Sequence, residues 1–284
     1  MPDKQIKVGL GWWGFREMPI EEHLRVADTY GFKTLEFGIG DLVSTLPLKV
    51  LESEIEAFQK GAADRGIRLT HATVENDFTV GPEHREGMLE RTLQEMTLAR
   101  QVGADFIRLF AGFRPAAEMT EDAYQWLLHA FREAADHADN LELAIGIETH
   151  GQIQLDAEGA ALHTHTISTH RDWLIRLVED LPDEVGFNYD PGNLKAVEPE
   201  DKRYALDLLD ERINYCHLKD WKPMGEGWVA CAIGDDDLDY GELLRKMTYD
   251  GVYLIEYEPL EDVEDGIRRS LDYLKRLGFE LLKV

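Results

Sequence analysis

Short apolar runs alternate with longer amphipathic segments along the whole chain, and this alternation constrains the fold more than any other feature. Eight runs rich in β-branched and apolar residues lie at 6–10, 34–37, 67–71, 105–109, 143–148, 185–189, 213–217 and 252–256. The segments with helical periodicity lie at 21–30, 48–64, 88–101, 121–138, 170–179, 202–209, 238–247 and 263–277. Strands that alternate with helices in this way predict an α/β fold, a single (β/α)8 barrel.

Glycines mark the junctions between several of these helices and the strands that follow. Gly31 and Gly103 are examples, and glycine readily adopts the left-handed conformation that closes a helix. An open doubly wound sheet is the alternative, but it usually has fewer strands and a glycine-rich phosphate loop after the first strand. Here Gly9, Gly11 and Gly14 are accompanied by two tryptophans and by no clean helix start. The pattern therefore favours the barrel.

One segment interrupts this regularity. Residues 151–169, between the fifth predicted strand and its helix, are too many for an ordinary connection, and they include His163 and His165. We expect a lid or a subunit-contact loop there rather than a missed helix. Both histidines are expected to be loop residues, since no obvious carboxylate partner accompanies them. No proline- or serine-rich linker divides the chain, so the prediction is one domain, residues 1–284.

The balance of charge argues against one large class of partner. The 284 residues include 30 Lys and Arg against 56 Asp and Glu, which gives a formal net charge of −26. Nucleic acids are bound largely through basic side chains, so we expect no nucleic-acid partner. Cys216 and Cys231 are too few for a disulfide framework, and no run of roughly 18 apolar residues is present to span a membrane. We expect a cytoplasmic protein with two buried thiols and no membrane partner; homo-oligomer formation stays open.

Four consecutive strands of the predicted barrel end in residues that bind metals. At the ends of the fifth to eighth strands lie Glu148, Asp190, His217 and Glu256. The carboxyl ends of all strands of such a barrel face one mouth, so these side chains are expected to converge. Any one of them could instead cap a helix or form a salt bridge, but three carboxylates together would repel one another unless a cation neutralised them. The set predicts one divalent metal ion, with Mn²⁺ favoured and Mg²⁺, Co²⁺ or Zn²⁺ as alternatives.

Further polar side chains are expected near the same mouth. His71 ends the third strand, and His150 and Lys219 each follow a predicted ligand by two positions. We expect His71 and His150 to bind substrate, and Lys219 to contact a substrate oxygen. For Lys219, a salt bridge to Asp220 or to a neighbouring carboxylate is the alternative. Arg108, on the fourth strand, is favoured as an internal ion-pair partner.

Taken together, these residues resemble the xylose-isomerase-like TIM-barrel superfamily of sugar isomerases and epimerases. The matching segments are 9–12, 27–36, 103–108, 147–148, 189–193, 217–220, 234–240 and 255–256. The resemblance thus spans nearly the whole chain. Members of the superfamily hold one divalent metal ion with Glu, Asp, His and Glu from the fifth to eighth strands. Carried over by position, the implied ligands are Glu148, Asp190, His217 and Glu256.

One position departs from the pattern of the superfamily. Many members have His three residues after the aspartate of the sixth strand, where this chain has Asn193. Asparagine both donates and accepts hydrogen bonds, so Asn193 is kept as a candidate substrate contact. Trp12 and Trp13 follow the first strand, where an indole face could stack on the apolar side of a sugar ring. Packing within the loop is the alternative for both.

The resemblance implies a metal-dependent isomerase or epimerase that acts on a keto-sugar or a keto-inositol. In similar enzymes the two ligand glutamates move the proton, so Glu148 and Glu256 are the expected acid and base on either side of a metal-stabilised enediolate. The alternative keeps both glutamates as ligands only and assigns the base to His150 or to a water. The expected partner is a small-molecule sugar.

Three other functions stay open at this point. A metal-dependent lyase or dehydratase of a keto-inositol or keto-glycoside would begin with the same proton abstraction, and the superfamily includes inosose dehydratases. Endonuclease-four-type DNA-repair enzymes share the fold, but they need a multinuclear zinc site with many more histidines and a basic face, both of which are missing from the sequence. A non-catalytic carbohydrate-binding barrel would keep the pocket without needing a metal.

Overall fold

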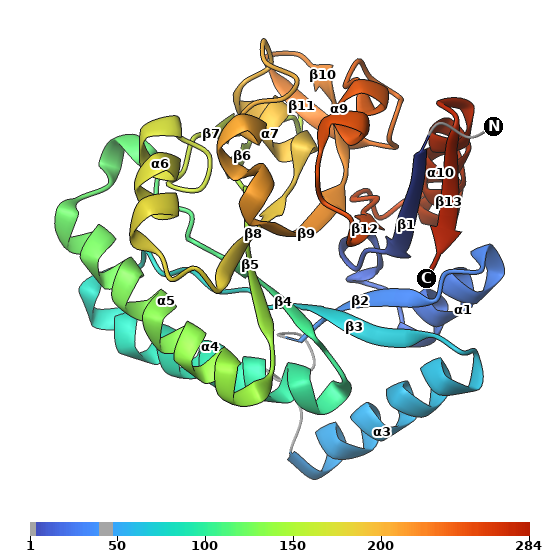
Figure 1. Ribbon diagram of the computed structural model, residues 1–284, viewed down its shortest axis with the longest axis horizontal. Helices are drawn as coiled ribbons and strands as arrows, with labels where there is room; N and C mark the ends of the chain where they lie inside the picture. The colour runs from blue at the N-terminus through green and yellow to red at the C-terminus, as the bar shows by residue number, and fades with distance from the viewer. Residues whose placement is uncertain (1–3, 40–47) are drawn as a thin grey trace.

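The computed structural model describes residues 4–39 and 48–284, and its centre is a closed barrel of parallel strands (Figure 1). The barrel strands are β1 (Lys4–Leu10), β2 (Thr34–Gly38), β3 (Arg68–Thr73), β4 (Phe106–Phe110), β5 (Ala144–Glu148), β8 (Val185–Tyr189), β9 (Ile213–Leu218) and β12 (Val252–Ile255). They pair in this order, and β12 returns to pair with β1 and close the barrel. The predicted (β/α)8 barrel is confirmed.

Helices surround the barrel and cover its outer face (Figure 1). They are α1 (Ile20–Tyr30), α3 (Leu48–Asp64), α4 (Arg85–Val102), α5 (Glu121–Leu141), α6 (Arg171–Asp180), α7 (Pro191–Val197), α8 (Leu206–Leu209), α9 (Tyr240–Lys246) and α10 (Val263–Arg276). Strands β2 and β8 are buried over their whole length. Strands covered on both faces explain why the runs read as continuous apolar segments.

Two parts of the predicted helix pattern differ in the structure. The helix expected over 202–209 is reduced to α8, because Ala205 adopts a left-handed backbone with φ of 62° and a helix cannot pass through that conformation. Conversely, α7 begins directly after Asp190 and was not expected from periodicity. It is a short helix, and six of its seven residues are buried, so it lacks the alternation of faces that identifies a helix in a sequence.

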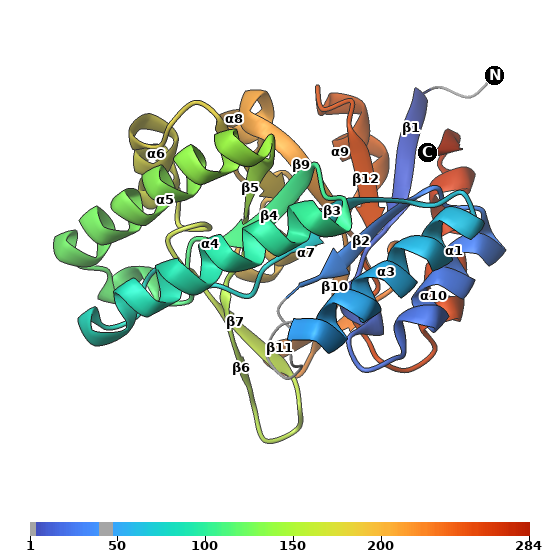
Figure 2. The ribbon, with the colours of Figure 1, turned by 90° about the horizontal axis from the view of Figure 1, so that it is seen from below.

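The segment 151–169 contains a β-hairpin rather than an irregular loop. Its strands are β6 (Gln152–Leu155) and β7 (Ala161–Thr164), and a second hairpin follows β9 with strands β10 (Asp220–Met224) and β11 (Gly227–Cys231). The four strands form a separate antiparallel sheet in the order β10-β11-β7-β6. Figure 2 shows the β6–β7 hairpin projecting from the body of the barrel. The expected roles of this segment, as a lid or a subunit contact, stay predictions.

Three further features of the fold bear on the predictions: the last strand, the two cysteines and the apolar content of the helices. Strand β13 (Phe279–Lys283) pairs in parallel with residues 4–8 of β1, an addition to the barrel that the sequence pattern did not suggest. Cys216 and Cys231 are buried free thiols, as expected. Among the described residues, no helix combines the length and apolar composition that a membrane-spanning segment requires.

Candidate metal centre and adjoining pocket

The four residues at the ends of β5, β8, β9 and β12 converge on one point. One ligand atom from each of Glu148, Asp190, His217 and Glu256 lies within 4.8 Å of all the others, and all four residues are buried. From the Nδ1 atom of His217, the nearest carboxylate oxygens are 3.8 Å away in Glu148, 4.0 Å in Asp190 and 3.6 Å in Glu256. The strand-end rule therefore brings together one imidazole nitrogen and three carboxylates.

Asp190 is positioned by the start of α7. It is the N-cap residue of that helix, and its Oδ1 accepts a hydrogen bond of 2.9 Å from the backbone N–H of Asn193. Its other oxygen, Oδ2, faces the cluster and makes no hydrogen bond to any residue that the structure describes. Gly192 allows this turn to lie against β9, because a Cβ there would come within 2.4 Å of the backbone oxygen of Lys219. Capping thus fixes one carboxylate oxygen and leaves the other for a ligand.

His217 is held in place by the carboxylate of Glu36, which belongs to β2. Its Nε2 lies 2.6 Å from Oε1 of Glu36 on β2, and the same oxygen accepts a hydrogen bond of 2.5 Å from the hydroxyl of Tyr215. The backbone N–H of Trp12 donates to Oε2 of Glu36 at 2.8 Å. A histidine whose far nitrogen donates to a carboxylate can offer its near nitrogen to a metal. In the structure this near nitrogen, Nδ1, lies 3.1 Å from the side-chain amide nitrogen of Asn188, a contact that a metal ion would replace. Sequence reasoning missed Glu36, although a glutamate inside the short buried run of β2 was the available signal.

Two cations neutralise part of the carboxylate cluster. The Nζ of Lys219 lies 2.8 Å from Glu256, 3.2 Å from Asp190 and 3.3 Å from Glu258. The guanidinium of Arg108 lies 3.0 Å from Oε2 of Glu148. Lys219 therefore pairs with the carboxylates of the mouth, one of the two alternatives considered for it.

The ion pairs around the cluster decide between the alternatives considered for Lys219 and Arg108. Asp220 is paired with the buried Lys195 at 2.5 Å and is not a partner of Lys219 in the structure. Arg108 bridges two carboxylates, because its Nε faces Glu148 and its Nη2 lies 2.9 Å from Glu75. Arg108 is thus an internal ion-pair partner, as favoured, and also borders the pocket described below.

The pKa values of the cluster reflect burial and crowding of charge. Burial and the nearby Glu148 and Glu256 raise the pKa of Asp190 to about 7, although Lys219 opposes this. Burial would raise the pKa of Glu148, but Arg108 and His217 hold it well below its usual range. Burial would lower the pKa of His217, but the surrounding glutamates raise it well above its usual value. Without a further cation, the cluster keeps protons that a divalent ion would displace.

The donor set fits a divalent metal ion. Oδ2 of Asp190 and Oε2 of Glu256 are buried and make no hydrogen bond within the described part of the chain, although both lie near the ammonium of Lys219. Buried carboxylate oxygens left without hydrogen bonds are uncommon because they lose their hydration. Three carboxylates and one imidazole suit Mg²⁺, Mn²⁺, Co²⁺ or Zn²⁺. The described residues thus include a cluster that could hold a metal ion.

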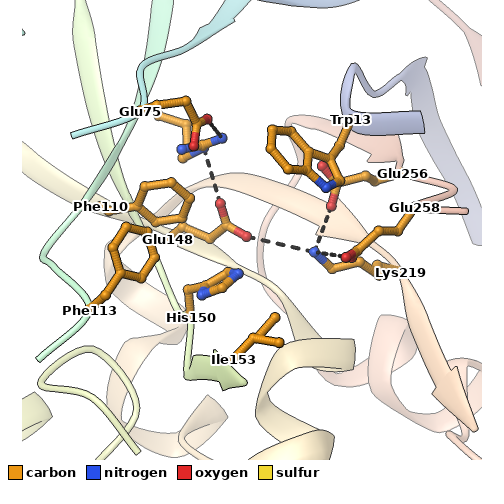
Figure 3. A pocket seen from close by; sticks show the side chains of 11 residues that line it. Trp13, Glu75, Phe110, Phe113, Glu148, His150, Ile153, Lys219, Glu256 and Glu258 are labelled. Carbon is orange, nitrogen blue, oxygen red and sulfur yellow. Dashed lines mark hydrogen bonds and ion pairs between the residues drawn. The ribbon is translucent and has the colours of Figure 1, made fainter. Parts of the chain in front are cut away.

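A pocket of about 510 Å³ opens onto two of the four cluster residues, Glu148 and Glu256 (Figure 3). Three predicted substrate contacts, Trp13, His150 and Lys219, are part of its wall. The remaining wall consists of Glu75, Arg108, Phe110, Phe113, Ile153 and Glu258. Aromatic walls with a few convergent polar groups are typical of a small-molecule site.

The other two predicted substrate contacts lie outside the described lining of this pocket. Asn193 is buried behind the cluster, where its amide donates to Oε1 of Glu148 at 3.0 Å and its oxygen accepts from Nε1 of Trp221 at 3.3 Å. His71 is buried in the barrel interior, with its ring stacked on Phe106 at a centroid distance of 4.7 Å. In the structure Asn193 thus contacts a candidate ligand, and His71 packs below the mouth.

The residues that sequence reasoning did not select are mostly the aromatic and acidic walls. Phe110 and Phe113 lie with ring centroids 4.7 Å apart, and Phe110 lies 5.1 Å from the ring of His150. Ile153 reaches the pocket from the β6–β7 hairpin. Phe110 ends β4, Phe113 follows three residues later, and Ile153 lies in β6, so their places depend on connections whose course the sequence does not specify.

Comparisons with known proteins agree with this architecture. A family model described as xylose isomerase-like TIM barrel matches residues 24–277. Among solved structures, a probable 3-DHS dehydratase, AsbF, from Bacillus anthracis superposes with a TM-score of 0.76 at 16% identity, covering 95% of this chain and 99% of that one. A 3-keto-D-glucoside 4-epimerase, YcjR, from E. coli gives a TM-score of 0.69 at 20% identity, with coverages of 96% and 100%.

A third similar structure was solved with a metal ion. It is a xylose isomerase-like TIM barrel protein from Mycobacterium smegmatis in complex with magnesium, with a TM-score of 0.70, 15% identity and coverages of 95% and 96%. At these identities the likeness of the solved structures shows the fold alone. None of the curated proteins matches the chain.

Proposed function

Because the chain belongs to the xylose isomerase-like TIM barrel family, we propose that it is a divalent-metal-dependent isomerase or epimerase of a keto-sugar or keto-inositol. The observation that carries this proposal is the convergence of Glu148, Asp190, His217 and Glu256 beside a pocket that Glu148 and Glu256 line. A similar structure is that of a 3-keto-D-glucoside 4-epimerase. Another similar structure was solved in complex with magnesium, which supports a divalent metal ion for this chain as well.

The proposed reaction needs a proton to leave the carbon next to a carbonyl and to return. A divalent ion held by the four residues would act as a Lewis acid that polarises the carbonyl. Glu148 and Glu256 come from β5 and β12, on two sides of the cluster, and both line the pocket. One glutamate removes the proton and the other returns it, so that each face of the substrate has its own carboxylate.

His150 is the weaker candidate for the base. Burial lowers the pKa of His150 to about 4, although Glu148 opposes this. The pKa of Glu148 is lowered as well, so the pKa values do not separate the two residues. The two glutamates are favoured because they belong to the four-residue cluster and His150 does not, and His150 remains a candidate for binding a hydroxyl.

The charge of the pocket favours a neutral substrate. Its two cations, Arg108 and Lys219, are each within 3.3 Å of two or more carboxylate groups. A phosphate or carboxylate group would have to compete with these carboxylates and would meet the repulsion of Glu75 and Glu258. An unphosphorylated keto-sugar or keto-inositol carries hydroxyl groups, which can donate hydrogen bonds to these carboxylates.

The test is metal analysis followed by isotope exchange. Protein loaded with Mn²⁺ or Mg²⁺ is incubated in heavy water with a panel of ketoses and keto-inositols, and deuterium uptake at carbon is measured by mass spectrometry. We expect one equivalent of metal and exchange on at least one member of the panel. Glu256→Gln should lower the exchange by at least about 100-fold, whereas Glu133→Gln on the outer helix α5 should not. Full exchange by a folded, metal-loaded Glu256→Gln or Glu148→Gln protein would refute the proposal.

A dehydratase on the same site is the second candidate, and Glu258 is the observation that favours it. This residue lines the pocket 3.3 Å from Lys219, and burial raises the pKa of its carboxyl. A carboxyl with a raised pKa takes up a proton more readily, and in that form it could protonate a departing β-hydroxyl after the first proton is removed. Product mass separates the two reactions, because isomerisation and epimerisation conserve mass and dehydration removes one water.

A further inference from the structure

A second hollow adjoins the metal pocket on the side of β1, β2 and β3. It has a volume of about 600 Å³ and shares Trp13 and Glu75 with the metal pocket. The rest of its wall is Trp12, Arg16, Glu17, Gly38 and Thr73. Figure 3 shows Trp13 and Glu75 on the same side of the metal pocket, across from His150 and Ile153. The two hollows therefore meet at these two side chains.

The indoles of this hollow are fixed in place. Trp12 lies against the backbone of Gly38, where a Cβ would come within 2.3 Å of its Nε1. The guanidinium of Arg16 lies 4.7 Å from the centre of the Trp13 ring and donates to the backbone oxygen of Trp13 at 2.7 Å. Trp12 is buried and Trp13 is half-buried. Rigid indole faces bind the C–H face of a ring at little cost in side-chain entropy.

One buried polar group in this wall lacks a partner. Thr73, the last residue of β3, is 2% exposed, and its hydroxyl makes no hydrogen bond among the described residues. A buried hydroxyl without a partner costs free energy that a bound hydroxyl would recover. Thr73 lines the second hollow and does not line the metal pocket as described. Its free hydrogen-bonding capacity therefore belongs to this second hollow.

The charges of the second hollow select against an anion. Its only cation among the described lining residues is Arg16, whose guanidinium already donates to two backbone oxygens, those of Trp13 and Glu258. Two carboxylates, Glu17 and Glu75, face it. Carboxylates and indoles together suit a neutral ring with hydroxyl groups, because the carboxylates accept the hydroxyls and the indoles cover the apolar face.

We infer that this hollow is a second subsite that binds a neutral sugar ring, so that the substrate is a keto-glycoside rather than a free monosaccharide. The keto-sugar lies at the cluster, and the glycosidic partner passes Trp13 and Glu75 to reach Thr73 and Glu17. This inference rests on the proposed function and narrows its substrate class.

The experiment compares three probes that share one keto ring. They are 3-ketoglucose, methyl 3-ketoglucoside, and maltose oxidised at C3 of its non-reducing ring. Deuterium exchange is measured with the metal-loaded protein for each. We expect kcat/KM for the disaccharide to exceed that of the methyl glycoside by about tenfold or more. Binding of maltose itself, followed by tryptophan fluorescence, gives a readout that needs no turnover.

Two variants locate the gain. Thr73→Val keeps the shape of the side chain and removes the hydroxyl, and Glu17→Ala removes an exposed carboxylate. Each should raise KM for the oxidised maltose about 2- to 10-fold and leave the constants for 3-ketoglucose unchanged. Thr29→Val on the outer face of α1 is the matched control and should change neither.

The outcomes separate this inference from the proposed function. Exchange on 3-ketoglucose with no advantage for the disaccharide overturns the subsite alone. An advantage for the disaccharide that both variants leave intact also overturns it. Failure of every keto-sugar and keto-inositol to exchange deuterium counts against the proposed function instead.

Discussion

The two halves of the barrel contribute differently to the candidate metal centre. The half formed by β5, β8, β9 and β12 supplies all four candidate ligands, each at or next to the last residue of its strand. The other half, β1 to β4, supplies Glu36 from β2 and Arg108 from β4. These two residues lie within their strands and contact the candidate ligands His217 and Glu148. One half thus offers atoms to a metal, and the other fixes the orientation and charge of those atoms.

The largest effect should come from removing a ligand without removing its structural role. Asp190→Asn keeps an oxygen to cap α7, since asparagine caps helices as well as aspartate does, but it loses the anionic oxygen that faces the cluster. We expect metal affinity to fall by more than about 100-fold, beyond the range typical of residues behind the ligands. Isothermal titration with Mn²⁺ measures it.

The same variant separates metal binding from folding. Loss of one of three crowded carboxylates should leave the metal-free protein at least as stable as the wild type in a thermal melt. Burial and the nearby Glu148 and Glu256 oppose the charge of Asp190 more than Lys219 favours it. Asp183→Asn, at an exposed position near α6, is the control. Unchanged Mn²⁺ affinity in Asp190→Asn would remove the cluster from consideration as a metal centre.

These two halves also differ in how far the sequence predicts them. Glu148 and Glu256 were found because a polar residue that ends an apolar run stands out, and because the barrel places all such ends at one mouth. Glu36 lies in the middle of a run, where a sequence does not reveal whether it faces the interior or the outer helices until the register of β2 is known. The sequence therefore predicts the ligands better than the residues that orient them.

The pocket walls are the part that the sequence predicts least. Ile153 reaches the pocket only because residues 151–169 fold into a hairpin that packs on β11, a contact between distant parts of the chain. Thr73 ends β3 like a candidate ligand, but its importance lies in a hydroxyl that has no hydrogen-bond partner in residues 4–39 and 48–284. Both facts depend on tertiary packing, which periodicity and strand-end position do not encode.

A second prediction removes the charge that orients His217. Glu36→Gln keeps the shape of the side chain but loses the anion that receives the Nε2 proton of His217 at 2.6 Å. Second partners of metal-bound histidines typically contribute about 10- to 100-fold to metal affinity, so a decrease in this range is expected in the Mn²⁺ titration. Glu95→Gln, the same change at a buried glutamate on α4, should leave the affinity unchanged. A Glu36→Gln protein with wild-type affinity would show that Glu36 has no positioning role.

A third prediction concerns pH, which should act on the ligand half and leave Glu36 unaffected. The folded pKa values of Asp190, about 7, and His217 are raised above their unfolded values. These groups stabilise the metal-free protein at low pH, and their contribution is lost as pH rises through the folded pKa values. Despite burial, His217 and Tyr215 hold the pKa of Glu36 at about 2, so Glu36 does not titrate near neutral pH.

The measurement is a pair of melting curves between pH 8 and pH 6. The metal-free protein should gain stability as pH falls, whereas the additional stability given by Mn²⁺ should shrink, because protons compete for the ligands at about tenfold in affinity per pH unit and proton. Asp190→Asn should show a shallower slope in the metal-free melt. Parallel slopes with and without Mn²⁺ would contradict the assignment of these groups as ligands.

The smallest effect on metal affinity should come from Asn193, an uncharged residue that contacts the candidate ligand Glu148. Asn193→Ala removes the amide that donates to Oε1 of Glu148 at 3.0 Å, but Arg108 still holds the other oxygen of Glu148. One lost hydrogen bond corresponds to about 2- to 10-fold in Mn²⁺ affinity, less than expected for Glu36→Gln. Asn193→His, which restores a donor, should recover part of the loss, and Asn140→Ala on α5 is the control. If Asn193→Ala lowered the affinity as much as Glu36→Gln, neutral hydrogen bonds would matter as much as charge here, and the distinction between the two halves would fail.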